Sequence, residues 1–187
     1  MFDHIFIIHR AIDTSRDISE LLKMKCTSCI EIIEPEPIKD NTDQLICMWS
    51  KKKQSQQNII SLYETNMKLL KRIENEKLNN VLILEDDAQL LHDSMELNQD
   101  CMLHSLYYTR WKERYIGAVA NYYPSWKKTS ILISSLESYR IAKINKHRPW
   151  DLELDYMRDK YNLNFSYNNY FTHPQNESTL GNNKFNL

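Results

Sequence analysis

The stretch Val81-Leu82-Ile83-Leu84-Glu85-Asp86-Asp87 joins four consecutive apolar residues to three consecutive carboxylates. A short apolar run of this kind is typical of a strand that is buried on both faces of a parallel sheet. Three adjacent acidic side chains repel one another and contribute nothing to strand packing. In open α/β sheets, ligands bind beyond the carboxyl ends of the strands. We therefore expect an α/β sheet whose ligand site begins at Glu85.

The acidic triplet Glu85-Asp86-Asp87 has two physical explanations. A divalent cation such as Mg²⁺ or Mn²⁺ would neutralise the three charges, because these hard ions prefer oxygen ligands. Alternatively, the triplet lies in a solvated loop in which Asp86 or Asp87 caps the next helix. These three residues alone leave both interpretations open.

The rest of the chain alternates short apolar runs with longer amphipathic ones, which favours one α/β domain over residues 1–187 with a mostly parallel central sheet. The clearest helix is expected over residues 54–76, where apolar residues recur at spacings of three and four from Ile59 to Ile73. Further strands are expected at 5–8, 30–33, 115–119, 131–133 and near 165, and further helices after 14–15 and over 94–108, 135–145 and 151–161.

The composition excludes several classes of protein. The chain has 187 residues with 24 basic and 25 acidic side chains, so a net charge of -1 removes the usual basis for tight nucleic-acid binding. It has two glycines, whereas a dinucleotide-binding fingerprint or a phosphate-binding P-loop needs several in one turn. Neither a secretion signal nor an apolar stretch of roughly 20 residues is visible, so we expect no membrane span and a cytoplasmic location.

The segment Cys26-Thr27-Ser28-Cys29 is a lone Cys-x-x-Cys pair. A zinc knuckle would need a second pair, and a thioredoxin-type pair should open a helix, whereas Cys29 leads into an expected strand. We interpret the cysteines as reduced thiols of a cytosolic protein.

The segment Leu84-Glu85-Asp86-Asp87-Ala88 resembles the acidic signature of the family 25 glycosyltransferases, the group of lipopolysaccharide and collagen sugar transferases. Other segments resemble that family in the same order and span nearly the whole chain. They are Ile7-Ile8-His9-Arg10 with Arg16, Ser61 to Ile73, Ile131-Leu132-Ile133-Ser134 before a helix, Pro149-Trp150-Asp151, and Gln175 with Ser178-Thr179-Leu180-Gly181.

This resemblance implies the GT-A fold of nucleotide-sugar transferases, in a single domain. The chain departs from the family in two respects: Asn66 stands where the family usually has a histidine, and the chain is short for this fold. Together with a bias toward Ile, Asn and Lys, the small size suggests a large DNA virus as the source.

The resemblance implies that the acidic triplet holds Mn²⁺ or Mg²⁺, with Asp87 as a metal ligand and Glu85 reaching the metal or the ribose. Asp86 points the other way along an extended segment, toward the sugar or a helix cap. His173 is a candidate further ligand, because GT-A enzymes often add a late histidine and neutral imidazole suits Mn²⁺. An ordinary loop histidine beside Pro174 explains it equally well.

Asp151 is the expected general base, because the proline-x-aspartate element of the family falls on it. Asp155, four residues later, lies on the same face of the expected helix and is the second candidate. Capping of that helix is an alternative role for Asp151, since an acid is favoured at a helix N-terminus.

The loop after the first strand is the expected place for the nucleotide. Its candidate contacts are Ile8, His9, Arg10 and Arg16, together with Glu85 and Asp86, and arginine suits anions because it binds them in bidentate fashion. Lys51 to Lys53 either screen the diphosphate or form a solvated loop. Three aromatic residues in a polar segment, Tyr122, Tyr123 and Trp126, are the expected platform for stacking of a sugar.

The resemblance therefore implies a metal-dependent glycosyltransferase that moves a sugar from a nucleotide-diphosphate sugar, with UDP favoured, to a hydroxyl of a glycan or glycoprotein, with inversion. Two alternatives remain open. One is a binding module of the same fold without activity, which the Asn66 departure favours. The other is a Mg²⁺-dependent phosphotransferase or nuclease that uses the same acidic residues.

Overall fold

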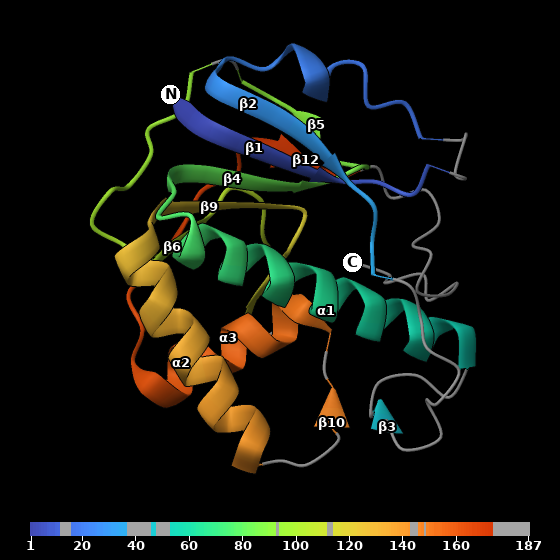
Figure 1. Cartoon of the computed structure of the whole chain (residues 1–187), viewed down its shortest axis with the longest axis vertical. Coiled ribbons are helices and arrows are strands. Elements are labelled where there is room, and N and C mark those ends of the chain that lie inside the picture. The colour runs from blue at the N-terminus through green and yellow to red at the C-terminus, as the bar shows by residue number, and fades with distance from the viewer. Residues whose placement is uncertain are drawn as a thin grey trace.

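Strand β4 (Asn79–Glu85) lies inside a six-stranded sheet in a computed structural model of the chain (Figure 1). The structure describes residues 1–11, 16–36, 46–47, 53–92, 94–111, 114–142, 146–147 and 149–173. The strand order is β11-β6-β9-β4-β1-β2. The other members are β1 (Phe2–Ile8), β2 (Cys26–Ile33), β6 (Leu103–Ser105), β9 (Ala120–Ser125) and β11 (Phe165–Tyr167).

The sheet is mostly parallel, as the sequence predicts. Strand β4 runs parallel to β1 and β1 to β2, while β9 runs antiparallel to both of its neighbours, β4 and β6. Because β11 is parallel to β6, every strand except β9 has its carboxyl end at the same edge of the sheet. We call this edge the carboxyl edge.

The apolar run in β4 is buried on both faces, which is why it does not alternate with polar residues. Val81 and Ile83 belong to a core cluster between the sheet and the helices, whereas Leu82 and Leu84 belong to a second cluster on the opposite face. Three helices cover the first face, namely α1 (Lys53–Asn75), α2 (Trp126–Ala142) and α3 (Trp150–Tyr161) (Figure 1).

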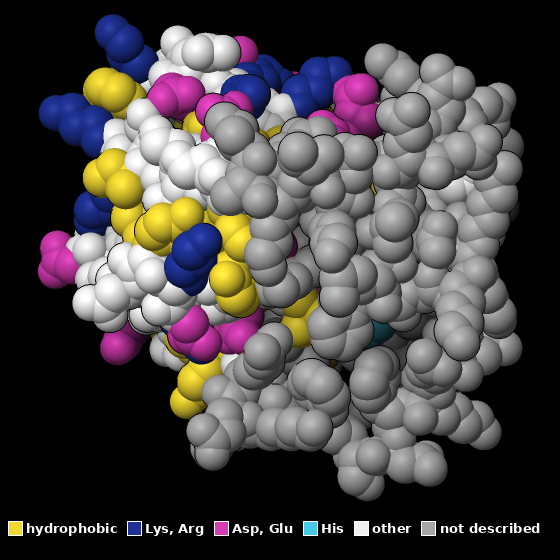
Figure 2. Space-filling model, turned by 90° about the horizontal axis from the view of Figure 1, so that it is seen from below, with side chains coloured by type: hydrophobic (Ala, Val, Ile, Leu, Met, Phe, Trp, Pro, Cys, Tyr) yellow, Lys and Arg dark blue, Asp and Glu magenta, His cyan; other side chains and the backbone are white. Residues whose placement is uncertain are grey.

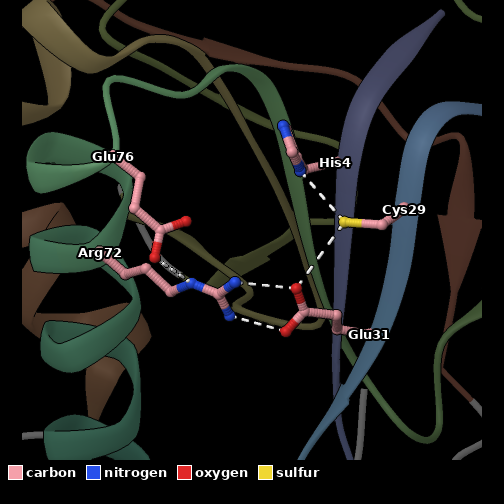
Figure 3. A network of polar contacts seen from close by, with 5 residues as sticks. All are labelled: His4, Cys29, Glu31, Arg72 and Glu76. Carbon is pink, nitrogen blue, oxygen red and sulfur yellow. Dashed lines mark hydrogen bonds and ion pairs between the residues drawn. The ribbon is translucent and has the colours of Figure 1, made fainter.

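A polar network holds α1 against the edge of the sheet (Figure 3). Arg72 donates from Nη1 and Nη2 to the two carboxylate oxygens of Glu31 over 2.7 and 2.8 Å, and from Nε to Glu76 over 2.8 Å. The guanidinium carbon also lies 4.9 Å from the ring centroid of Phe6. The pair joins α1 to β2, and the hydrogen bonds from Arg72 lower the pKa of Glu31.

The same network explains why the Cys-x-x-Cys pair makes no common site. The Sγ atom of Cys29 lies 3.2 Å from Nδ1 of His4 on the helix side of the sheet. Cys26 packs instead with the core cluster of the other face and donates to the carbonyl oxygen of Asp3. Both thiols are free.

Several predicted elements are wrong. Residues 94–108 form no helix but an irregular segment with the strand β6, and Ile131–Ile133 lies inside α2 rather than in a strand. The segment around Tyr122, which the sequence analysis treats as polar and accessible, is the central strand β9. Near residues 115–119 there is only β8 (Arg114–Ile116), which pairs with β7 (Thr109–Trp111) in a separate ribbon, and near residues 16–23 only the 3₁₀ turn η1 (Leu21–Lys23).

Two further short pairings complete the described part. Strand β5 (Gln89–Leu90) is antiparallel to β12 (Phe171–Thr172), and β3 (Ile46–Cys47) is parallel to β10 (Lys146–His147). No helix within the described ranges has the length and apolar character needed to cross a membrane. On the face seen in Figure 2, the coloured Lys and Arg side chains are interspersed with Asp and Glu rather than gathered into one basic patch.

Candidate functional site at the carboxyl edge of the sheet

The acidic triplet lies in a turn at the carboxyl end of β4. The backbone N–H of Glu85 donates to the carbonyl of Val119 over 2.8 Å, and the N–H of Ala88 donates back to the carbonyl of Glu85 over 3.1 Å. The chain then enters β5 rather than a helix. The interpretation in which Asp86 or Asp87 caps the next helix is therefore wrong.

Asp87 makes the central contact of the site. Its Oδ2 lies 2.9 Å from Nε2 of His173 and 3.4 Å from Nη1 of Arg16, while its Oδ1 is buried with no hydrogen-bond partner among the described residues. The antiparallel pairing of β12 with β5 brings His173 to the end of β4. The hydrogen bond to Asp87 raises the pKa of His173 above its ordinary value.

His9 reaches Asp86 because β1 and β4 are paired in parallel. The register places Ile8 opposite Glu85, so the next residues on each strand also meet, and Nδ1 of His9 lies 3.0 Å from Oδ2 of Asp86. Ile8 itself is buried in the helix-side core, so its side chain cannot contact a nucleotide. The sequence prediction therefore fails for the side chain of Ile8.

The other predicted nucleotide contacts diverge. Arg10 donates from Nη2 to Oδ1 of Asn58 over 3.3 Å and so leans on α1, whereas Arg16 points to Asp87. Lys51 and Lys52, together with Gln175 and residues 178–181, lie outside the described residues. The two arginines therefore have different partners, α1 for Arg10 and the acidic triplet for Arg16.

Glu85 and Asp151 are brought into the same electrostatic environment. Burial raises the pKa of Glu85 to about 8, and the charges of Asp87, Asp151 and Asp86 add to this effect, while Arg16 opposes it. Burial likewise raises the pKa of Asp151, with a smaller contribution from Asp155. The carboxyl groups of Glu85, Asp86, Asp87 and Asp151 thus interact electrostatically in a partly buried environment. A bound cation would relieve their repulsion.

Asp151 lies in the first turn of α3, after the N-cap residue Pro149. The backbone N–H groups of Asp151 and Leu152 donate to its carboxylate, which lowers its pKa and opposes the effect of burial. Asp151 is thus bonded to N–H groups at the start of its helix, and its charge also acts on Glu85 of the acidic triplet. Its role as general base stays a prediction. Asp155 is only 2% exposed, and its Oδ1 lies 2.8 Å from Nη2 of Arg158.

Tyr107 belongs to this site, although the sequence analysis did not single it out. Its ring stacks on that of His173, with centroids 6.2 Å apart and planes at 30°. Burial raises its pKa, and the charges of Asp87 and Asp151 contribute as well. Tyr107 follows the carboxyl end of β6. A prediction of residues 103–105 as a strand would therefore have placed it at this edge.

The predicted sugar-stacking platform is wrong. Tyr122 and Tyr123 are 0% exposed because they lie in β9 and point into the two core clusters. Trp126 is the first residue of α2 and packs beside Lys77 and Lys127. Asn66, the departure from the family pattern, is buried in α1 and donates to the carbonyl of Leu62 within the same helix.

The fit of a divalent cation rests on Asp87 and His173. Across the described residues, no group of three or more His, Cys, Asp or Glu side chains is placed to hold a metal ion by itself. Asp87 nevertheless has one buried oxygen to which none of these residues gives a hydrogen bond, next to the imidazole of His173. A Mg²⁺-type ion commonly takes only one or two protein ligands and completes its shell with substrate phosphates and water, so these residues fit that kind of site.

Comparisons with known proteins bear on the fold. No family model matches the chain, and no curated protein matches it. Among solved structures, a match is the crystal structure of a glycosyltransferase involved in the glycosylation of the major capsid of PBCV-1, with a TM-score of 0.50 and 10% identity over 90% of this chain and 82% of that one. Family 25 membership stays a prediction. The likeness confirms the predicted α/β class: this chain has a fold similar to that of a viral glycosyltransferase.

Proposed function

We propose that this chain is a glycosyltransferase that uses a nucleotide-diphosphate sugar, with UDP favoured, and a glycan or glycoprotein hydroxyl as acceptor. One observation carries the proposal: Asp87 contacts His173 and Arg16, has a buried oxygen without a partner among the described residues, and shares with Asp151 an electrostatic influence on Glu85. Anionic ligands of α/β sheets bind at this edge. The fold likeness to a glycosyltransferase adds support.

Asp87 and His173 would hold Mn²⁺ or Mg²⁺. The charge of Asp87 acts on Glu85, so an ion bound at Asp87 would also act on Glu85. When bound, such a cation neutralises the diphosphate as it leaves. Arg16 would supply a second positive charge, because its guanidinium already lies 3.4 Å from the carboxylate that faces the metal position. His9 and Arg10 would line the neighbouring nucleotide site.

Asp151 would take the proton of the acceptor hydroxyl. In an inverting transfer, the acceptor oxygen bonds to the anomeric carbon as the bond from that carbon to the diphosphate oxygen breaks, and the hydroxyl proton passes to the base. Burial makes Asp151 a stronger base than a solvated aspartate, since it raises the pKa. Asp155 is the weaker candidate, because its carboxylate is buried against Arg158.

A binding module without activity is the second candidate. It is favoured by the hydrogen bonds that Asp151 accepts from its own helix, which are enough to explain an aspartate at this position. In that case the site would hold a nucleotide or a nucleotide sugar, but no transfer would follow.

Calorimetry with UDP, with and without Mn²⁺, tests the proposal. We expect UDP to bind and its affinity to rise with Mn²⁺; absence of UDP binding in both conditions would exclude a UDP-sugar transferase. A screen of nucleotide sugars for Mn²⁺-dependent hydrolysis and for protection against thermal unfolding then separates an enzyme from a binding module and identifies the donor.

A further inference from the structure

Three tyrosines from distant parts of the chain form a cluster at the carboxyl edge. We call Tyr108, Tyr115 and Tyr167 the tyrosine cluster. The rings of Tyr115 and Tyr167 are stacked, with centroids 4.7 Å apart and planes at 25°, and Tyr108 meets both edge-on at 5.3 and 5.7 Å. All three side chains are partly exposed. The sequence analysis missed them because they come from three separate short elements.

The partners of the tyrosine cluster among the described residues lie beside the stacked pair of Tyr115 and Tyr167. The guanidinium carbon of Arg158 lies 5.6 Å from the ring centroids of both Tyr115 and Tyr167. Tyr108 is also nearly equidistant from them. A group equidistant from two stacked rings lies beside the stack and not over either outer face. Neither Arg158 nor Tyr108 therefore covers these faces.

Arg158 fixes the cluster in place. It donates from Nη1 to the hydroxyl of Tyr167 over 2.8 Å, its Nη2 lies 2.8 Å from Oδ1 of Asp155, and it also donates to Asp159. Because these bonds tie Arg158 to Tyr167 and to two carboxylates, Arg158 positions the rings of the cluster. A preorganised aromatic surface loses little conformational entropy when a ligand binds.

The cluster lies next to the proposed active site. Tyr108 follows Tyr107, whose ring stacks on His173, and Tyr167 ends β11 at the same edge at which β4 ends. Gly117 allows this approach, because a Cβ atom there would lie 2.4 Å from the carbonyl oxygen of Tyr107. On the other side, Arg158 and its partner Asp155 both belong to α3, the helix that also carries Asp151.

We propose that the tyrosine cluster binds a pyranose ring of the acceptor, stacked on the outer face of Tyr115 or Tyr167. The C–H bonds on one face of a pyranose carry partial positive charge, and the face of an aromatic ring is negative, so the two surfaces attract while burying apolar area. This inference rests on the proposed function, because it assigns the acceptor to the same site.

The test uses the full chain and a panel of methyl pyranosides, namely those of glucose, galactose, mannose, xylose, fucose and rhamnose. Binding is measured by saturation-transfer NMR in the presence of UDP and Mg²⁺, which is diamagnetic, and again without them. We expect at least one glycoside to bind, Tyr115→Ala to weaken it about tenfold, and Tyr115→Phe to stay within about threefold of wild type, because the ring is kept. Tyr161→Ala, an exposed tyrosine outside the cluster, is the matched control and should change nothing.

Melting temperatures accompany each variant. If Tyr115→Ala does not fold, the wild-type protein labelled with 3-fluorotyrosine decides: the ¹⁹F signal that Tyr115→Phe removes must shift when the glycoside is added. Binding of no glycoside, or equal binding by wild type and Tyr115→Ala, would overturn the inference. A shift of that signal with uridine instead of a glycoside would assign the cluster to the nucleotide base and also overturn it.

The two proposals fail in different ways. Absence of UDP binding together with glycoside binding that depends on Tyr115 would reject the transferase and keep a sugar-binding surface. UDP binding without such glycoside binding would keep the transferase and reject the acceptor assignment.

Discussion

The Nε2 atom of His173 lies 2.9 Å from Oδ2 of Asp87, although the two residues belong to distant parts of the chain. The pairing of β5 with β12, two strands of only two residues each, makes this contact. The hydrogen bond raises the pKa of His173 and leaves the other oxygen of Asp87 without a partner among the described residues. The contact therefore ties the acidic triplet at the end of β4 to the residue that follows β12.

Removal of the Asp87 carboxylate should abolish metal-dependent nucleotide binding. In Asp87→Asn, the charge that balances the cation is lost, so we expect UDP affinity in Mn²⁺ to fall to that measured without metal. Calorimetry measures both values. Asp100→Asn is the control, because Asp100 is an exposed acid before the amino end of β6, at the opposite edge of the sheet. Unchanged metal-dependent binding in Asp87→Asn would show that the metal position is elsewhere.

Replacement of Asp151 should separate catalysis from helix capping. Asp151→Asn keeps the shape of the side chain and an acceptor for the helix N–H groups, but removes the base, so we expect turnover to fall by roughly 10²- to 10⁴-fold. UDP binding and the melting temperature should stay near wild type. Asp151→Ala should in addition lower the melting temperature, since those N–H groups lose their acceptor. If the Asp151→Asn enzyme is active, Asp151 is not the base, and Asp155 becomes the candidate.

The pair of Arg72 and Glu31 should make the protein less stable in acid. Hydrogen bonds from Arg72 lower the pKa of Glu31 below that in the unfolded chain. The pair therefore stabilises the fold above the unfolded pKa of about 4.3, and this contribution is lost as the pH falls through the lower folded value. Because both side chains are about one-third exposed, we expect about 1 kcal/mol or less.

Urea denaturation of wild type and Glu31→Gln at pH 7 and pH 3 measures this effect. The variant should be less stable than wild type at pH 7, and the difference should shrink at pH 3. Glu137→Gln, which removes a more exposed partner of Lys71, is the control and should show a smaller difference at pH 7. An unchanged difference between Glu31→Gln and wild type at the two values would mean that the pair does not titrate as described.

His104 should add a second loss of stability, at a higher pH. It is 1% exposed, burial lowers its pKa, and the backbone N–H of Asn98 donates to its Nδ1 over 3.2 Å. The neutral ring is therefore favoured in the fold, whereas the unfolded chain takes up a proton near pH 6.5. Because the unfolded state binds more protons, stability should fall as the pH drops below about 6.5.

The ring C–H resonance of His104 tests this directly. In a pH titration by NMR it should keep its neutral position as the pH falls through the ordinary histidine value of about 6.5. A His104 resonance that shifts with its midpoint at or above that value would contradict the prediction.

The sequence predicts best where one physical cause dominates. The run Val81–Leu84 and the run Ile5–Ile8 are apolar because both faces of their strands are buried, and the parallel pairing of such strands places their following polar residues together. For this reason Asp86, Asp87, His9 and Arg16 are all found at one edge. The sites of metal, nucleotide and base are still predictions that the experiments above test.

Prediction of secondary structure fails where the local preference of a segment disagrees with the way its side chains are buried. Ile131–Ile133 has the β-branched composition of a strand, but Leu132, Leu136 and Tyr139 are buried at helical spacing against the sheet, and that packing decides. In β9, the polar Asn121 and the nearby Pro124 suggest a loop, yet the two tyrosines between them fill both cores. The tyrosine cluster depends on pairing between distant segments, which no local pattern reports.

The order of strands in the sheet also bears on how the protein is made. His9 leaves the ribosome first, the acidic triplet follows much later, and His173 comes near the end of the described chain. At a synthesis rate of about 5–20 residues per second, several seconds pass between synthesis of the acidic triplet and synthesis of His173. During that interval β4 has β1 beside it but neither the completed β9–β6–β11 half nor the imidazole of His173. The acidic triplet of a nascent chain therefore exists for that time without the hydrogen bond that joins Asp87 to His173 in the complete fold.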